Sequence, residues 1–247
     1  MKWKVWGLLA GRSRMDKSMA TYLDGMGESL VIPHTMFLLR GPATVVVDTS
    51  FESPEIIKAA YPQEVWRSPE EHPLALLSQL GVRAEEVMMV ICTHLHYDHC
   101  GCNTAFPHAR VLVQRQEVEY ALNPTTKLMQ REFFSPAGGF QPPFDRAQFQ
   151  LLNGDQELDN GLKIVHLPGH TPGSQGVVVD SVRGRLCLAG DLIMVQENFD
   201  DEVPVGLHTD VDAWHRSHLK LRGLTDWVVP SHDLRIFSGD DRICELA

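Results

Sequence analysis

Short runs rich in valine, isoleucine and leucine, bounded by glycine, proline, asparagine or aspartate, recur along the 247-residue chain. Such runs are typical of buried β-strands. In the first half, the pattern predicts strands near residues 3–9, 36–40, 43–48, 87–92 and 110–114. In the second half, it predicts strands near residues 148–152, 162–167, 176–180, 185–190 and 227–230.

Helical patterns follow several of these strands. Ser53 and Pro54 predict a helix start, because serine is a good N-cap and proline suits the first helical position. Further helices are expected at residues 73–80, at 114–122, and from Asp210 to about residue 222. Strands that alternate with helices predict sheets covered by helices, which is the α/β class.

Residues 123–147 interrupt this pattern, because they show no clean helical or strand period. Long irregular segments in compact domains are usually functional or disordered. The four phenylalanines of the segment argue against disorder. We expect an apolar lid or pocket wall, with Phe140 and Phe144 in contact with a substrate. A loop that only packs against the domain is the alternative.

The densest group of potential ligands is the segment Thr93-His94-Leu95-His96-Tyr97-Asp98-His99, which follows an apolar run. Neutral imidazole and carboxylate are ligands that zinc, iron, manganese and cobalt accept. Because side chains alternate along a strand, a strand entering this loop would place His94 and His96 on one side. Asp98 and His99 would then turn toward a second position. The spacing therefore predicts two metal ions rather than one.

Histidine or aspartate also ends four other apolar strands, at Asp48, His170, Asp191 and His232. A site at one edge of a sheet is built in this way from distant parts of a sequence. A lone histidine is usually an ordinary residue, and an aspartate after a strand is usually a turn former. The combined set favours a metal site. Ordinary roles are assigned to the other seven histidines: His34, His72, His108, His166, His208, His215 and His218.

Charge and composition restrict the class of protein. With 22 basic and 32 acidic residues, the net charge is −10, which disfavours nucleic-acid and anionic-membrane partners. The candidate ligands extend from residue 94 to 232, so we expect a single domain over residues 1–247. Five cysteines without a disulfide-like spacing predict reduced thiols in a cytoplasmic protein. The short N-terminal apolar stretch is soon followed by Arg12, which favours a first strand over a signal peptide.

Taken in order, these motifs resemble the metallo-β-lactamase fold superfamily over Asp48 to His232. Four stretches resemble its N-acyl-homoserine lactonase branch, which is associated with quorum quenching. They are Ala10-Gly11-Arg12 with Met15-Asp16, His94 to Asn103, Gln114 to Ala121, and Glu197-Asn198-Phe199 with Glu202-Val203-Pro204. The fold that this resemblance implies is α/β, a four-layer αββα sandwich.

The resemblance also implies two divalent metal ions per chain, with zinc first and manganese, iron or cobalt as alternatives. One metal would be held by His94, His96 and His170, and the other by Asp98, His99 and His232. Asp191 would bridge the two metals. Asp48 would orient the metal loop by hydrogen bonding, as partners of metal ligands commonly do.

Such a centre predicts a hydrolase in which a hydroxide between the metals attacks a carbonyl carbon. With a lactone, the attack would open the ring, and Asp98 and Asp191 are the catalytic candidates. The expected substrate is an N-acyl-homoserine lactone or another small lactone, including an aromatic one, and the expected assembly is a monomer or homodimer. Two alternatives stay open: a metallo-hydrolase of thioesters, amides or phosphodiesters, and a non-hydrolytic metal-binding or redox protein.

The chain departs from the homoserine lactonases at one substrate-contacting position. Those enzymes carry a tyrosine three residues after the bridging aspartate, where its hydroxyl contacts the substrate carbonyl, but this chain has Met194. The departure favours a different lactone ring. His208 is the next candidate for a substrate contact. Flexible apolar lining could come from Met15, Met19 and Met36, although methionine more often fills a core.

Overall fold

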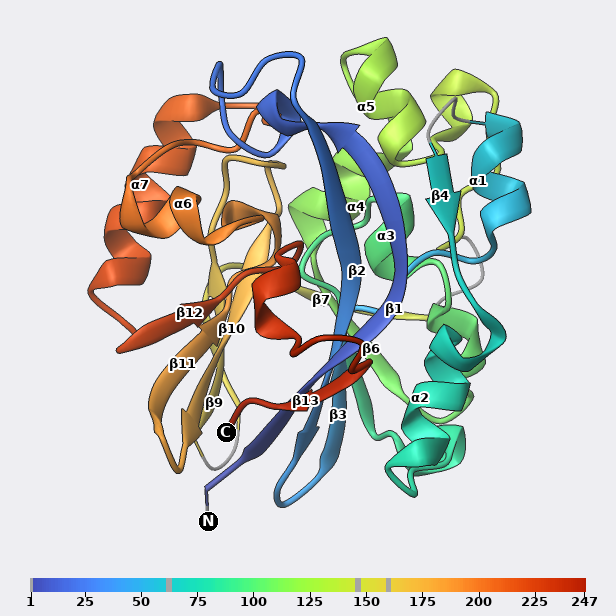
Figure 1. Ribbon diagram of the computed structural model, residues 1–247, viewed down its shortest axis with the longest axis vertical. Helices are drawn as coiled ribbons and strands as arrows, with labels where there is room; N and C mark the ends of the chain where they lie inside the picture. The colour runs from blue at the N-terminus through green and yellow to red at the C-terminus, as the bar shows by residue number, and fades with distance from the viewer. Residues whose placement is uncertain (1, 61–63, 145–147, 159–160) are drawn as a thin grey trace.

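The computed structural model describes residues 2–60, 64–144, 148–158 and 161–247, and this part of the chain forms two β-sheets (Figure 1). The strands of the larger sheet are β1 (Lys4–Asp16), β2 (Ser29–Arg40), β3 (Thr44–Val47), β4 (Glu64–Trp66), β5 (Met89–Ile91), β6 (Arg110–Gln114), β7 (Phe149–Leu152) and β13 (Ile243–Glu245). They lie in the order β13-β1-β2-β3-β5-β6-β7, and β4 pairs with β1.

The smaller sheet has the order β12-β11-β10-β9-β8. Its strands are β8 (Gln156–Glu157), β9 (Leu162–His166), β10 (Gln175–Ser181), β11 (Gly184–Leu188) and β12 (Trp227–Val229). The α-helices are α1 (Pro54–Ala60), α2 (Pro73–Gln79), α3 (Tyr97–Cys100), α4 (Arg115–Leu122), α5 (Lys127–Glu132), α6 (Gln196–Asp200) and α7 (Val211–Arg222). None of the helices in the described ranges combines the length and the apolar character needed to span a membrane.

The two sheets face each other across one apolar core. Phe37 and Val47 contribute to it from the larger sheet, and Ile164 and Val177 contribute from the smaller one. Most residues of β3 and β10 are buried, which explains the apolar runs in the sequences of these two strands. The interface between the sheets is therefore the centre of the molecule.

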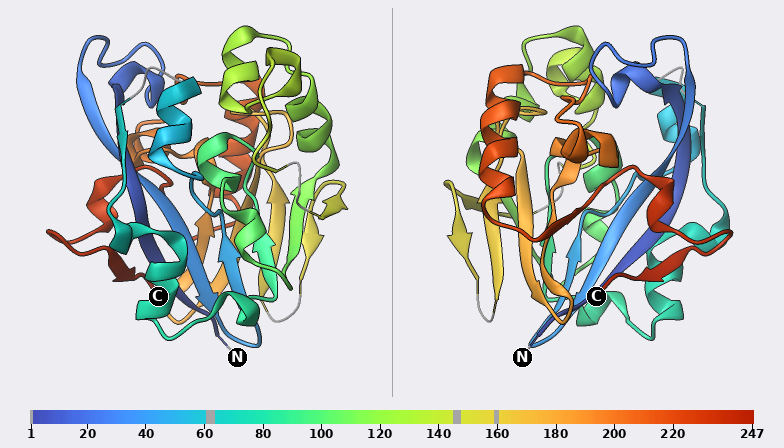
Figure 2. Two further views of the ribbon diagram at one scale, coloured as in Figure 1. Left: turned by 90° about the vertical axis from the view of Figure 1, so that its right-hand side faces the viewer. Right: turned by 60° about the vertical axis from the view of Figure 1, so that its left-hand side comes forward.

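Helices cover the outer face of each sheet, as the two views in Figure 2 show. On the larger sheet, Leu76 of α2 and Ala121 of α4 pack in one cluster with Val90 of β5. On the smaller sheet, Trp214 of α7 packs in another cluster with Cys187 of β11. The order of layers is helix, sheet, sheet, helix, so the predicted αββα sandwich is confirmed.

The predicted strands are present, but β1 and β2 are much longer than the apolar runs suggested. They pair as one antiparallel hairpin from Lys4 opposite Arg40 to Asp16 opposite Ser29, with a register shift between Leu9 and Arg12. Beyond that shift the hairpin is only partly buried. The apolar pattern in the sequence therefore covers only the buried part of these two strands. The short strands β4 and β13 were not predicted, because three residues carry little periodicity.

The carboxyl ends of several strands meet at one edge. β3 and β5 are parallel, with Val47 opposite Ile91, and β11 and β12 are parallel as well. Asp48 follows β3, and the histidine-rich segment follows β5. Asp191 and His232 follow β11 and β12. The topology therefore brings residues from distant parts of the sequence to a common edge.

The segment 123–147, of which the structure describes 123–144, is more regular than its sequence suggested, because it contains α5. Phe144 lies in the core of the larger sheet and its ring packs on Phe149. Phe140 packs at the margin of another cluster, with its ring 5.5 Å from that of Phe134. Neither ring is among the described residues that line the cavity beside the histidine cluster. The expectation that both contact substrate is corrected to a packing role.

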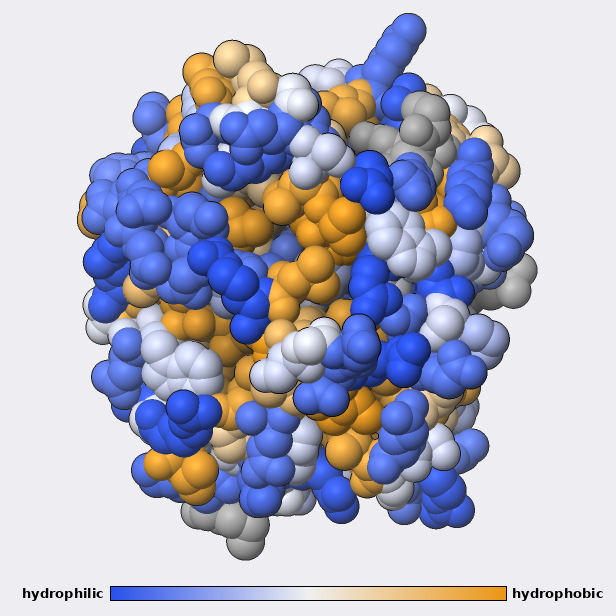
Figure 3. All heavy atoms as spheres, in the orientation of Figure 1, coloured by the Kyte–Doolittle hydropathy of each residue, from blue (hydrophilic) through white to orange (hydrophobic). Residues whose placement is uncertain are grey.

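The face of the molecule drawn in Figure 3 agrees with the polar composition of the chain. Figure 3 shows a mostly hydrophilic face with apolar side chains exposed toward its centre.

All five cysteines are unpaired, and four of them are buried. Cys102 points its sulfur at the Phe51 carbonyl oxygen, 3.3 Å away.

Replacing Phe144 by alanine should lower the free energy of unfolding by about 3–5 kcal/mol, because it removes a buried ring from the core. Phe140→Ala should cost less, because Phe140 is only partly buried. Urea unfolding of both variants measures the difference, and metal content should not change. A Phe144→Ala variant of full stability but altered substrate preference would return this ring to the pocket wall.

Candidate metal centre

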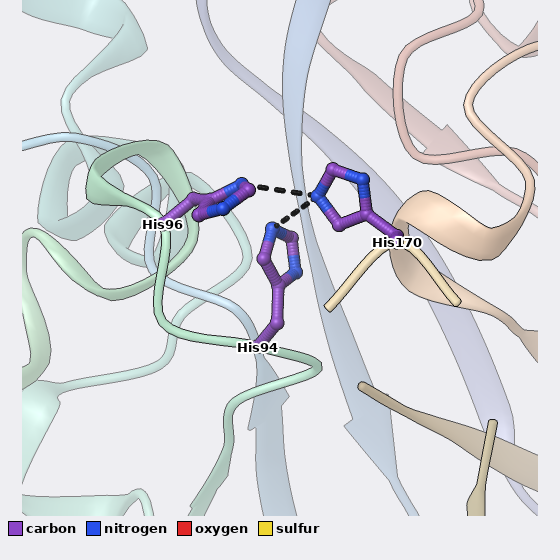
Figure 4. Close-up of side chains that lie close together, drawn as sticks. All are labelled: His94, His96 and His170. Atoms are coloured by element: carbon purple, nitrogen blue, oxygen red, sulfur yellow. Dashed lines mark hydrogen bonds between the residues drawn. The ribbon is translucent and has the colours of Figure 1, made fainter. Parts of the chain in front are cut away.

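The first group of potential ligands joins two loops. His94 and His96 lie between β5 and α3, and His170 lies in the loop between β9 and β10. Figure 4 shows the three rings pointing toward one another. The His170 Nε2 atom is 3.2 Å from His94 Nε2 and 3.0 Å from His96 Nδ1. These nitrogens have the separations of ligands around one metal, because zinc–nitrogen bonds of about 2.0–2.1 Å in a tetrahedron place neighbouring ligands about 3.3–3.4 Å apart.

The second group contains Asp98, His99 and His232. The two histidine Nε2 atoms are 3.2 Å apart, and Asp98 Oδ2 is 3.7 Å from each of them. Asp98 and His99 belong to α3, whereas His232 follows β12. These separations also fit one coordination sphere.

Asp191 connects the two groups. Its Oδ1 atom is 3.2 Å from His99 Nε2 and 3.1 Å from His232 Nε2. Its Oδ2 atom is 3.5 Å from His170 Nε2 and 3.9 Å from His94 Nε2. One carboxylate oxygen therefore faces each group. The seven predicted ligands are brought together, and their donor atoms fit two metal ions sharing one carboxylate.

Burial is the largest influence on the pKa of each of these groups. It lowers the pKa of His94 and His96 well below the usual value, and neighbouring histidines lower it further. Burial also opposes a charged His99, but the surrounding carboxylates raise the pKa of that ring well above its usual value. For Asp191, burial raises the pKa, and the neighbouring histidines outweigh this effect and hold it well below the usual range. Metal binding needs neutral imidazoles and ionised carboxylates, so it would relieve this crowded arrangement.

Three hydrogen bonds fix the orientation of the outer nitrogens of the ligand rings. Asp48 Oδ2 accepts one from His99 Nδ1 at 2.8 Å. The His170 Nδ1 atom donates to the Leu207 carbonyl oxygen at 2.6 Å, and His232 Nδ1 donates to the Pro33 carbonyl oxygen at 2.7 Å. In each ring Nε2 is thereby left for a metal, which is the usual role of such partners.

Asp48 also holds the loop that carries the histidines. Its Oδ1 atom accepts from the Thr93 backbone N–H at 2.7 Å, and Oδ2 accepts from the Thr93 hydroxyl at 2.7 Å. Asp48 is thus in contact with the metal loop, and the orienting role that the resemblance implies stays a prediction.

Glu117 of α4 is a supporting residue that the sequence reasoning missed. Its carboxylate accepts from the Leu95 backbone N–H at 2.9 Å, the Thr171 hydroxyl at 2.7 Å and the Gly173 backbone N–H at 3.0 Å. Leu95 lies between His94 and His96, and Thr171 follows His170, so one side chain ties both loops of the first metal group together. Burial raises the pKa of Glu117 to about 7, and the three donors act in the opposite direction.

The approach of the His170 loop to α4 explains one of its glycines. A Cβ atom on Gly173 would clash with the backbone of Glu117. Only glycine allows its N–H to reach the carboxylate without displacing the helix.

A cavity opens beside the two ligand groups. The described residues that line it are Met15, Met19, Ile32, His34, His96, Tyr97, Asp98, Glu132, Asp191, Met194, Leu207 and His232. Met194 thus lies where the sequence placed it, and Met15 and Met19 supply the lining that was considered for them. Met36, by contrast, is buried in the core of the larger sheet.

Two histidines differ from their expected places. His208 is not among the described residues lining the cavity; its Nδ1 donates to the Val205 carbonyl oxygen at 2.7 Å, and its ring packs edge-on against Tyr22. His34, which was assigned an ordinary role, does line the cavity, and its Nδ1 lies 2.9 Å from Asp98 Oδ2. An isolated histidine directly after Pro33, within an apolar strand, was the only signal.

The chain matches the family model described as the metallo-beta-lactamase superfamily over residues 31–232. It belongs to that superfamily. Curated relatives include an N-acyl homoserine lactonase of Bacillus sp, 29% identical and covering 81% of this chain and 80% of the relative. An N-acyl homoserine lactonase AttM of Azorhizobium caulinodans is also 29% identical, with 85% of each chain covered.

Solved structures confirm the fold. The quorum-quenching N-acyl homoserine lactone hydrolase superposes with a TM-score of 0.79 at 24% identity, over 95% of this chain and 94% of that one. The dizinc quorum-quenching lactonase AidC superposes with a TM-score of 0.68 at 17% identity, over 99% of this chain and 94% of that one.

We expect about two metal equivalents per chain by elemental analysis of protein prepared with excess metal. Asp191→Asn should lose one or both metal ions, because a neutral amide with one oxygen replaces the carboxylate whose two oxygens face the two ligand groups. Asp212→Asn, an exposed aspartate of α7, is the matched control and should retain both. A single equivalent in the unaltered protein would contradict the two-metal geometry.

Glu117→Gln should weaken metal binding about 10–100-fold, the usual effect of losing a partner that orients ligands. The amide nitrogen would face donors that now reach a carboxylate oxygen. Glu119→Gln on the exposed side of the same helix provides the comparison. Competition with a chelator measures both affinities, and equal values for the two variants would remove Glu117 from the centre.

Proposed function

We propose that this protein is a metal-dependent lactonase with two divalent metal ions. Zinc is the metal that we expect first, before manganese, iron or cobalt. The observation that carries the proposal is the position of Asp191, whose two oxygens face two separate groups of histidine and aspartate donors. The names of the similar proteins, N-acyl homoserine lactonases, support the choice of reaction.

Each group of side chains has a distinct part in holding the centre. His94, His96 and His170 would hold one ion, and Asp98, His99 and His232 the other, with Asp191 between them. When bound, the ions supply a nucleophilic hydroxide near neutral pH and polarise the lactone carbonyl.

Asp98 is the ligand best placed to move a proton. Its side chain is 12% exposed and lines the cavity, whereas that of Asp191 is 5% exposed and that of His94 is fully buried. Opening the ring leaves an alkoxide on the same molecule, which needs one proton to become the hydroxyl of the product. Asp98 lies at the boundary between the ligand groups and the cavity, where it could take up the proton that the attacking hydroxide brings and pass it to the alkoxide.

The side chains around the cavity indicate the chemical character of a lactone that they would favour. Met15, Met19 and Ile32 offer apolar contact from the β1–β2 hairpin, and Leu207, whose backbone N–H donates to the Met19 carbonyl oxygen at 3.0 Å, adds to it. Met194 supplies no hydroxyl to a substrate carbonyl. These contacts favour a lactone with its own apolar or aromatic body over one that needs a tyrosine donor.

Proton release during hydrolysis of a panel of lactones, with zinc- and manganese-loaded protein, tests the proposal. Parallel assays with a lactoylglutathione-type thioester and bis-nitrophenyl phosphate distinguish the other hydrolase classes. Lactone opening that depends on added metal and on Asp191 is expected. Turnover of the thioester or phosphodiester alone would replace the lactonase assignment.

Replacing Met194 by tyrosine should raise kcat on acyl-homoserine lactones, because one well-placed oxyanion donor can be worth about 10²–10³. Met194→Phe adds the ring without the hydroxyl and should give no such gain. Met194→Ala should mainly weaken binding of the best substrate, because it removes an apolar contact. Efficient wild-type turnover of acyl-homoserine lactones, with no improvement by tyrosine, would contradict this account of position 194.

A further inference from the structure

His34 is a buried polar residue that the ligand groups described so far do not use. It lies on β2, is 1% exposed, and lines the cavity beside Asp98 and His232. Neither of its ring nitrogens has an aligned hydrogen-bond partner in the described part of the chain. An imidazole buried in this way is costly unless something else satisfies it.

The contact between His34 and Asp98 is informative because it is short but lacks the geometry of a hydrogen bond. Asp98 Oδ2 lies 2.9 Å from His34 Nδ1, yet it is not in line with the ring N–H. A hydrogen bond that fixed Asp98 would favour alignment. Two ligands of one metal instead point at the metal and lie beside each other, with donor atoms about 3 Å apart. The contact fits the second arrangement.

The surroundings of His34 place it at the second metal group. Its ring meets the ring of His232 edge-on, with centroids 5.5 Å apart. One donor atom from each of His34, Asp98 and His232 lies within 4.8 Å of the other two. On another side the ring packs edge-on against Phe51, at 5.0 Å, which offers no hydrogen-bond partner. The polar side chains described around the His34 ring are therefore those of the second ligand group.

We propose that His34 is an additional ligand of the second metal position, beside Asp98, His99, His232 and Asp191. This inference rests on the two-metal centre proposed above, but it does not depend on the substrate. The second position would then have five protein ligands and the first position four. A position with more ligands favours metals that accept five or six, such as Mn2+ or Co2+, over tetrahedral zinc.

Titration of the metal-free protein with Co2+ tests the inference, because the visible absorption of cobalt is strong in tetrahedral sites and weak at higher coordination number. The wild type should bind two equivalents, and the one at the position with five protein ligands should absorb more weakly than the other. In His34→Gln, the weakly absorbing equivalent should bind at least about 10-fold less tightly and should absorb more strongly. The other equivalent should be unchanged.

The matched control is His218→Gln. His218 is also fully buried and has one ring nitrogen without a partner in the described ranges, but it lies on α7 and stacks on Trp214. This variant should leave both cobalt steps unaltered. If His34→Gln does not fold, His34→Ala with added imidazole replaces it, and the imidazole should restore the wild-type spectrum.

Two results would overturn the inference. Unchanged affinity and spectrum of both equivalents in His34→Gln would remove His34 from the centre. Weaker binding with an unchanged spectrum would make His34 a positioning residue that acts through Asp98. Lactone hydrolysis measured in parallel separates this inference from the proposed function: a wild type that shows both cobalt signatures but opens no lactone contradicts the function alone.

Discussion

The crowding of imidazoles and carboxylates at one edge of the two sheets is the constraint on which the rest of the site depends. The side chains of His94, His99, Asp191 and His232 are at most 5% exposed. Buried ionisable groups are unfavourable unless they are paired or coordinate a metal. The hydrogen bonds that Asp48, Glu117 and the Leu207 and Pro33 carbonyl oxygens accept therefore hold in place an arrangement suited to metal ions.

Much of this centre could be predicted from the sequence, because its spacing is local. His94 to His99 form one short segment. Apolar runs that end in Asp191 and His232 predict ligand-bearing loops at the edge of a sheet. The fold could be predicted less completely from the residue pattern. The apolar pattern gave the α/β class and most strands, whereas the four layers came from the resemblance to a known family.

The missed features depend on contacts between distant segments. Glu117 looks like an ordinary acidic residue of an exposed helix, and only the approach of Leu95 and Gly173 gives it a role. His34 is more than sixty residues before Asp98 in the sequence, and only the pairing of the sheet brings them together. Phe144 was misplaced for the opposite reason, because an aromatic residue in an irregular segment can face a pocket or a core with the same sequence pattern.

The β1–β2 hairpin has a consequence for how this protein could change during evolution. It supplies Met15, Met19, Ile32 and His34 to the cavity, whereas all seven ligands predicted from the sequence lie after residue 93. Part of the cavity lining is thus separated along the chain from the seven predicted ligands, whereas Met194 and Leu207 lie in the same part of the chain as those ligands. Exchanging this hairpin for that of a relative would change part of the cavity lining and replace His34, while leaving the seven predicted ligands unaltered.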